Sequence, residues 1–316
     1  MYQRKGSYLS SAGKTYSVPS RDNNINFLRF IAASLVIWFH MASLLAIPEP
    51  YIMGQGLGPI AVNIFFVLSG YLIAKSWTRS SSFGSYLIRR IARIFPGLAV
   101  VILLSVFVMG PIVTSLPLGD YFADAGTWKY LSLIVLAPIS NVLPGVFDAN
   151  PLPYAVNGSL WTLRYEFLAY LLTPLLYAAT KKLCGGRKLV FAVVLAVLVL
   201  VHFLSYSGLY PLPKVFDNLF RLFAYYMAGV AVLELGLDKY CDSQFAVVAL
   251  LVIIVFRDQV GIFSSLIMFV CVCTFTLGFS LTSNPRFAPC FKKNDYSYGI
   301  YIYAFPIQQC VVWLGG

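Results

Sequence analysis

The chain has 316 residues, of which 59% are hydrophobic and 11% are charged, and its mean hydropathy is +0.78. About a quarter of the residues of a soluble domain are charged, so the composition excludes that class and favours a polytopic membrane protein. The net charge of +11 does not indicate a nucleic-acid partner, because the basic residues follow a membrane topology.

Nine apolar stretches approach the length of about 20 residues that a helix needs to cross the hydrocarbon core. They predict an all-α polytopic bundle of about 9–10 transmembrane helices. Residues 1–24 are expected to form a disordered cytoplasmic tail, and residues 25–316 a membrane domain. The spans are expected at 25–47, 58–77, 94–113, 159–180, 188–206, 216–236, 244–256, 261–281 and 296–314.

The distribution of lysine and arginine orients these spans. With the N-terminus in the cytoplasm, 17 of the 23 basic residues fall in cytoplasmic segments and three fall in outer loops, at Lys129, Lys214 and Arg257. Such a bias sets the orientation of membrane proteins and brings basic residues to anionic membrane lipids. The remaining three, Arg29, Arg164 and Arg221, lie within spans.

The stretch 128–140 is apolar but too short to cross the bilayer. If it were a span, the basic residues at 181–188 would face outward, which contradicts the excess of lysine and arginine in cytoplasmic segments. We therefore expect an interfacial or re-entrant segment within a long outer loop, 110–158. Loops of this length are more often functional than simple connectors.

Arg29 and His40 are ionisable residues within the first span. Ionisable residues inside a membrane are costly and mark candidate functional sites. Their spacing of eleven residues returns the two side chains to within about 20° of one helix face, roughly 16 Å apart along the axis. These two side chains suit a path along the helix in which Arg29 attracts an anionic ligand and His40, at the end of the path, acts as a base. Alternatively, Arg29 snorkels to headgroups and His40 makes a helix–helix hydrogen bond.

Arg90 and Arg93 belong to a basic cluster that precedes the third span on the cytoplasmic side. Residues three apart are neighbours on a helix, and arginine binds phosphate through a planar fork of donors. The pair therefore suits a diphosphate or the 3′-phosphate of coenzyme A. The alternative is plain positive-inside anchoring, which needs no ligand.

Glu166 lies in the stretch NGSLWTLRYEFLAY, where Ser159 is expected to cap the helix. By rise per residue, Glu166 and His40 reach similar depths in the outer half of the bilayer. A carboxylate beside an imidazole orients the ring and raises its basicity. We therefore expect Glu166 to meet His40. The alternative is that Glu166 pairs with Arg164 or Arg221 as a structural contact.

Three further features carry weaker signals. Ser69 precedes Gly70 without the surrounding pattern of a nucleophile elbow, and small residues in membrane helices usually allow close packing. His202 is interpreted as interfacial. Cys271 and Cys273 diverge on a helix and have no accompanying ligands, so no metal site is expected.

Five segments in chain order resemble the acyltransferase-3 family of bacterial membrane O-acyltransferases, which includes O-antigen, exopolysaccharide and nodulation-factor acetylases. They are Arg29-x10-His40, FFVLSGYLI at 65–73, the R-x-x-R of Arg90 and Arg93, SLWTLRYEF at 159–167 and NDYSYGIYIYAFPIQQ at 294–309.

The resemblance implies a fold of about ten spans and an acetyl-CoA donor. It implies that His40 is catalytic, that Arg90 and Arg93 bind the donor, and that Glu166 is the family's acidic residue. The nine expected spans place the C-terminus outside, whereas family members usually continue through one more helix, so a final helix is expected to be missing. The outer hydrolase-like domain of some relatives is not expected either.

We therefore expect an integral O-acyltransferase of the bacterial inner membrane that moves an acetyl or other short acyl group from acyl-CoA to a sugar hydroxyl of an envelope or exported glycan. Arg90 and Arg93 would hold the CoA phosphates, and Arg29 would guide the donor arm. His40 would act as general base, and Glu166 would orient His40 or hold the acceptor. The alternative from another class is a transporter or flippase for lipid-linked glycans, which also tolerates buried ionisable residues.

Overall fold

The structure, a computed structural model, describes residues 8–9, 15–16, 23–137, 140–181, 186–259, 261–282, 291 and 295–315. Nearly all regular structure in these residues is helical, which confirms the all-α prediction. The predicted disorder of the tail 1–24 concerns residues that lie mostly outside this description. The strands form two short antiparallel pairs, β1 (Tyr8–Leu9) with β2 (Thr15–Tyr16) and β3 (Tyr51–Ile52) with β4 (Gln55–Gly56).

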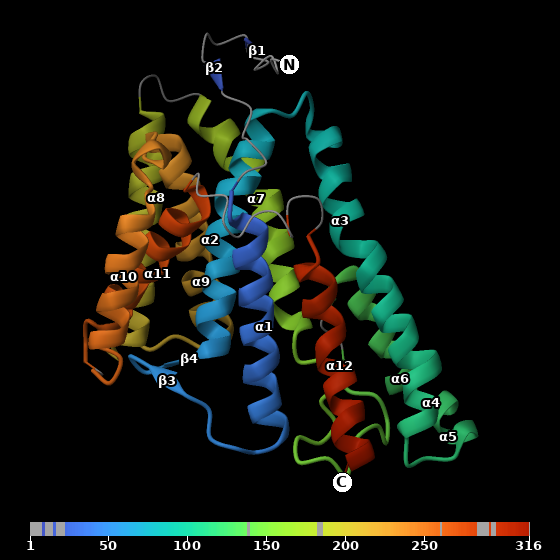
Figure 1. Cartoon of the computed structure of the whole chain (residues 1–316). Helices are drawn as coiled ribbons and strands as arrows, with labels where there is room; N and C mark the ends of the chain where they lie inside the picture. The colour runs from blue at the N-terminus through green and yellow to red at the C-terminus, as the bar shows by residue number, and fades with distance from the viewer. Residues whose placement is uncertain are drawn as a thin grey trace, which may run out of the picture.

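The long helices lie side by side in one bundle, with the start of α1 and the end of α12 at opposite ends (Figure 1). A bilayer favours this architecture because a helix satisfies its own backbone hydrogen bonds. Six helical segments are long and apolar enough to cross a membrane: α1 (Ile25–Leu44), α2 (Leu57–Thr78), the run from α3 (Phe83–Leu104) to α4 (Gly110–Val113), α8 (Arg187–Tyr206), α9 (Lys214–Leu235) and α11 (Ser264–Leu281).

Three further helices correspond to the remaining predicted spans: α7 (Leu163–Lys181), the shorter α10 (Ser243–Val255) and α12 (Ser297–Gly315). They lie in the same bundle (Figure 1). The chain is thus a multi-pass membrane protein. We call the end at which α1 begins the basic end, because Arg89, Lys181 and Arg187 lie there, and the opposite end the far end.

Helix α3 begins at Phe83 rather than at the predicted residue 94. The Ser82 hydroxyl accepts a hydrogen bond from the Ser85 backbone N–H at 3.2 Å, and the Ser82 backbone N–H donates to the Ser85 hydroxyl at 3.3 Å. This capping box starts the helix well before the apolar stretch. Arg90 and Arg93 therefore lie on α3 itself instead of preceding it.

The segment 128–140 does not cross the bundle in its described residues, as predicted. The outer loop that contains this segment forms α5 (Leu118–Ala123), α6 (Ala125–Tyr130) and a 3₁₀ turn (Leu131–Val135) at the far end. The Tyr121 hydroxyl, which is fully buried, donates to the Val106 carbonyl oxygen at 2.9 Å and holds this segment against the end of the third span.

Helix α2 is the centre of the bundle, since 72% of its apolar stretch is buried inside the protein. It crosses α9 closely at two glycines. A Cβ on Gly70 would lie 1.9 Å from the Tyr226 carbonyl oxygen, and one on Gly229 would lie 2.1 Å from the Val67 carbonyl oxygen. This confirms the interpretation of the Ser69–Gly70 pair as a site of close helix packing.

The α2–α9 contact predicts the effect of adding one methyl group. Gly229→Ala should destabilise the protein by about 1–3 kcal/mol, because the new Cβ overlaps the α2 backbone and the helices must separate. The matched control is Gly84→Ala on α3, where a Cβ meets nothing within 4 Å. Thermal unfolding in detergent measures both, and an unchanged midpoint for Gly229→Ala would contradict the close contact.

Candidate functional site

Arg29 is held deep in the bundle rather than at its surface. It lies in the second turn of α1, is 7% exposed, and its Nη1 forms an ion pair with Asp295 Oδ2 at 3.1 Å. One helical turn earlier, the Asn26 side chain donates to the Phe291 carbonyl oxygen at 2.9 Å, so the start of α1 is fixed to the segment before α12. The snorkelling alternative for Arg29 is therefore wrong.

Asp295, just before α12, is the shared partner of two arginines. Its Oδ2 also lies 2.8 Å from Arg93 Nη2, and its Oδ1 accepts hydrogen bonds from the Ser297 hydroxyl at 2.5 Å and the Ser297 backbone N–H at 3.2 Å. Burial alone favours the protonated carboxyl, but Arg29, Ser297 and Arg93 together hold the pKa of Asp295 below its ordinary value. The carboxylate is therefore charged at neutral pH.

Arg90 has different partners from Arg93, although the two are three residues apart on α3. Its guanidinium carbon lies 5.9 Å from the ring centroids of both Tyr86 and Tyr170. Its Nε is buried without a hydrogen-bond partner, and no carboxylate pairs with it among the described residues. Arg93 thus shares the carboxylate of Asp295 with Arg29, while Arg90 lies near two aromatic rings without such a partner among the described residues.

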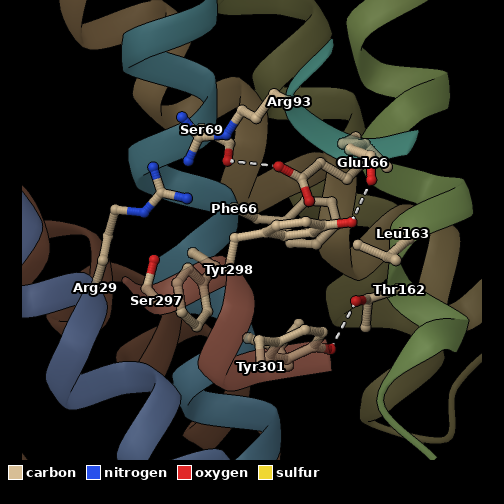
Figure 2. Close-up of a pocket in the computed structure, with 13 residues that line it drawn as sticks. Arg29, Phe66, Ser69, Arg93, Thr162, Leu163, Glu166, Ser297, Tyr298 and Tyr301 are labelled. Carbon is tan, nitrogen blue, oxygen red and sulfur yellow. Dashed lines mark hydrogen bonds between the residues drawn. The ribbon is translucent and has the colours of Figure 1, made fainter. Parts of the chain in front are cut away.

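The arginine cavity lies between α1, α2, α3, α7 and α12. Figure 2 shows Arg29 and Arg93 pointing into it from one side, with Glu166 facing them. Tyr298 crosses its middle and donates a hydrogen bond to the Ile94 carbonyl oxygen at 2.6 Å. The polar lining is Arg29, Ser69, Arg93, Thr162, Glu166, Ser297, Tyr298 and Tyr301.

Glu166 belongs to this arginine cavity and does not bond His40. Its Oε1 accepts hydrogen bonds from the Ser69 hydroxyl at 3.4 Å and from the Tyr170 hydroxyl. In the described part of the chain no ion pair joins it to Arg164 or Arg221 either. The expected contact with His40 is therefore wrong, because similar depth does not make two side chains face each other.

His40 lines a second and larger cavity, the histidine cavity, toward the far end. Its ring packs edge-on against Phe39 and Phe305, with centroids 5.2 and 4.8 Å away. Among the described residues nothing hydrogen-bonds the imidazole, so its nitrogens are available to a ligand. The polar and aromatic lining also includes Phe39, Trp161, Arg164, Tyr165, Lys214, Asn218, Arg221 and Tyr301.

The two cavities share Val62 and Tyr301 in their linings. The hydroxyls of Tyr301 and Thr162 are hydrogen-bonded at 2.7 Å (Figure 2). Arg29 and His40, expected on one stripe of α1, thus open into two neighbouring cavities. The partition between them therefore includes the side chain of Tyr301, which lines both cavities.

Two local expectations are wrong. The Ser159 hydroxyl is buried without a partner and does not cap the helix; the turn is instead fixed by Asn157 Oδ1, which accepts from the Ser159 N–H at 3.1 Å. His202 is not interfacial, because it is 2% exposed and lies inside the bundle with its ring 6.1 Å from Tyr206.

The sequence interpretation missed Asp295 and the polar partners of Glu166. Asp295 stands two residues before Ser297, a spacing typical of a side chain that accepts from the backbone at a helix start, and this was the available signal. Ser69 and Tyr170 gave no comparable signal, because their hydroxyls sit among apolar residues on separate helices.

Comparison with known proteins agrees with the geometry. A family model described as an acyltransferase domain matches residues 22–312. The chain is 33% identical to an O-acetyl transferase of Shigella phage Sf6, over 92% of this chain and 86% of that protein. No solved structure matches significantly.

Two further relatives match over shorter regions. Nodulation protein 10 of Rhizobium leguminosarum bv. viciae is 29% identical over 54% of this chain and 48% of that protein. A peptidoglycan O-acetyltransferase, OatA of Listeria monocytogenes, is 31% identical over 56% of this chain and 27% of that protein.

The shared carboxylate predicts the effect of Asp295→Asn. The substitution should cost roughly 1–3 kcal/mol, because two buried or half-buried arginines lose a charged hydrogen-bond partner. The matched control is Asp258→Asn, since Asp258 pairs with Arg257 at 3.1 Å but is 79% exposed, and exposed pairs contribute little. Thermal unfolding of the two variants makes the comparison.

The pH dependence follows from the lowered pKa of Asp295. A group with a lowered folded pKa stabilises the protein above its unfolded pKa of about 3.9 and loses that stabilisation as pH falls through the folded value. The difference in unfolding midpoint between wild type and Asp295→Asn should therefore stay constant from pH 8 to about pH 5 and shrink in stronger acid. A difference that already shrinks near neutral pH would contradict the ion-pair geometry.

Proposed function

Since the chain belongs to the acyltransferase-3 family of membrane proteins, we propose that it moves an acetyl group from acetyl-CoA to a sugar hydroxyl of a cell-envelope or exported glycan. The observation that carries the proposal is the pair of adjoining cavities. One is lined by arginines toward the basic end, and the other contains His40 toward the far end. The family assignment favours this enzyme over the transporter alternative.

The basic end suits the phosphates of the donor. Arg90 has a buried Nε without a partner and no carboxylate beside it, so an anionic ligand would supply the missing acceptor. Arg93 lies three residues further on the same helix, and its pairing with Asp295 leaves the rest of its guanidinium fork for a phosphate. Arg29 lines the cavity through which the pantetheine arm would extend.

His40 is the proposed general base. A neutral imidazole, the ordinary state of histidine above about pH 6.5, accepts the proton of the acceptor hydroxyl. The hydroxyl oxygen attacks the carbonyl carbon of the thioester, the carbon–sulfur bond breaks, and the proton passes from the imidazolium to the leaving sulfur. Phe39 and Phe305 hold the ring in place, which takes over the orienting role expected of a carboxylate.

Glu166 has a different proposed role from the one expected. It faces Arg29 and Arg93 across the arginine cavity and is tied to Ser69 and Tyr170. In this position it would balance the cations that line the donor path and keep Tyr170 beside Arg90. Its action on the reaction would therefore be to position the donor rather than to tune His40.

The proposed location is the bacterial inner membrane, with the basic end in the cytoplasm. The positive-inside distribution supports this orientation, and a cytoplasmic donor would then enter at the arginines. The acceptor glycan would approach from the far end. The names of two relatives, an O-acetyl transferase and a peptidoglycan O-acetyltransferase, support acetyl as the group and a glycan as the acceptor.

Removal of the base tests the reaction. His40→Ala should lower acetyl transfer by about 10²- to 10⁴-fold, the usual contribution of a positioned general base. The assay follows label from radiolabelled acetyl-CoA into extracted glycan in membrane vesicles. His202→Gln is the matched control, because His202 is the chain's other histidine and does not line the histidine cavity. Full transfer by folded His40→Ala protein would exclude His40 as the base.

Thermal stabilisation by acetyl-CoA tests the donor site, since a ligand of the native state raises its stability. Arg90→Gln and Arg93→Gln should each weaken acetyl-CoA binding about tenfold through loss of a charged hydrogen bond. Arg89→Gln is the control, because the exposed Arg89 bonds the Ser80 hydroxyl away from the cavity. Equal losses in all three variants would reject a specific phosphate site, and no stabilisation of the wild type would reject acetyl-CoA as donor.

A further inference from the structure

The histidine cavity contains more positive charge than proton transfer by His40 requires. Arg164, Lys214 and Arg221 all line it, and its lining includes no aspartate or glutamate among the described residues. Proton transfer by His40 needs no cation beside it, and a nearby cation would disfavour protonation of the imidazole. One cation suffices to stabilise the oxyanion that forms during acyl transfer, so three cations without a carboxylate also suit a negatively charged ligand.

Arg221 is the strongest element of this group. It is 9% exposed on α9, and its guanidinium donates to two neutral oxygens, Asn63 Oδ1 at 2.7 Å and Asn218 Oδ1 at 3.0 Å. Asp217, one turn earlier, contributes to the field at Arg221 but forms no ion pair with it. A buried charge held only by neutral amides is costly unless a ligand supplies the opposite charge.

Arg164 and Lys214 extend the cationic surface toward the far end. Arg164 lies over the Tyr165 ring at 4.9 Å and has a buried Nε without a hydrogen-bond partner. Lys214, the first residue of α9, is exposed at the cavity mouth. The first turns of α2, α7 and α9 also reach the cavity through Gly58, Arg164 and Lys214, and helix N-termini favour anions.

We propose that the histidine cavity binds the phosphate or diphosphate of a lipid-linked sugar through Arg164, Lys214 and Arg221, which holds the sugar hydroxyl at His40. This inference rests on the proposed function and names its acceptor class. Arginine forks match phosphate oxygens in geometry and charge. Trp161 and Tyr165, also in the lining, give aromatic faces against which a sugar ring can pack.

The position of the cations favours a lipid-anchored anion over one on a free polysaccharide. Arg164 and Lys214 lie in the first turns of α7 and α9, where a spanning helix reaches the headgroup region, and a lipid carrier places its phosphate at that level. Arg221 lies about two turns further along α9, deeper in the cavity. Val215 and Phe216 follow Lys214 and are 56% and 52% exposed, so apolar surface adjoins the cationic mouth. A hydrocarbon chain can lie against it while the phosphate enters the cavity.

Binding to the purified full chain tests the proposal with geranylgeranyl diphosphate as the probe and thermal stabilisation as the readout. Geranylgeraniol supplies the same hydrocarbon without charge, and glucuronate supplies a carboxylate sugar. We expect the diphosphate to stabilise the wild type. Geranylgeraniol and glucuronate should both have little effect on its stability. Added salt should reduce the stabilisation.

Variants of the cavity locate the binding. Arg164→Gln and Lys214→Gln should each bind the diphosphate about tenfold more weakly, the usual effect of losing a hydrogen bond between charged groups. Lys129→Gln, an exposed far-end lysine on α6 outside the cavity, is the matched control. If Arg164→Gln does not fold, Lys214→Gln, at an exposed position, still decides the question.

The outcomes separate this proposal from the proposed function. Equal binding by all variants, no stabilisation of the wild type, or equal effects of diphosphate and alcohol would overturn the phosphate site. A preference for glucuronate that needs Arg164 would overturn phosphate in favour of an acidic sugar. If the protein binds the diphosphate through Arg164 but transfers no acetyl group, the phosphate site stands and the proposed enzyme activity is wrong. If the protein transfers acetyl groups but does not bind the diphosphate, the activity stands and the phosphate site is wrong.

Discussion

The carboxylate of Asp295 forms ion pairs with Arg29 on α1 and Arg93 on α3, and it thereby joins three helices that are far apart in sequence. Each of the two cations would be costly in the bundle without this partner. Ser297 fixes the other carboxylate oxygen at the start of α12, so the position of the arginines depends on the position of that helix. The lining of the arginine cavity follows from this one contact.

The same helix carries residues that line or adjoin both cavities. Tyr298 and Tyr301 follow Asp295 on the first turns of α12, and Phe305 packs on His40 one turn beyond Tyr301. A displacement of α12 would therefore change the arginine pair, the partition and the histidine together.

Polar groups inside the bundle fall into two kinds. Arg29, Arg93 and Glu166 are matched by protein partners, which suits side chains that shape a path. His40 and Arg221 are not matched by any opposite charge in the described residues, and both line the larger cavity. Unmatched groups in a low-dielectric interior are where a ligand gains most from binding, which is why the larger cavity is the better candidate for the acceptor.

The sequence by itself determined the class of fold and, in the described residues, the helices that match the predicted spans. It also singled out Arg29, His40, Arg93 and Glu166, but it missed Asp295. Each helix depends on a run of apolar residues long enough for the bilayer, and a helix satisfies its backbone hydrogen bonds within that run, so these properties are local. The start of α3 was missed because a capping box of two serines, rather than the apolar run, sets it.

Only the tertiary structure decided which ionisable groups meet. Glu166 and His40 match in depth, but depth does not specify the rotation of each helix about its axis, and the packing of α7 turned Glu166 toward the arginines. The partner of Arg29 and Arg93 lies more than 200 residues from Arg93 along the chain. Its identity depends on how α12 packs between α1 and α3, which no local pattern encodes.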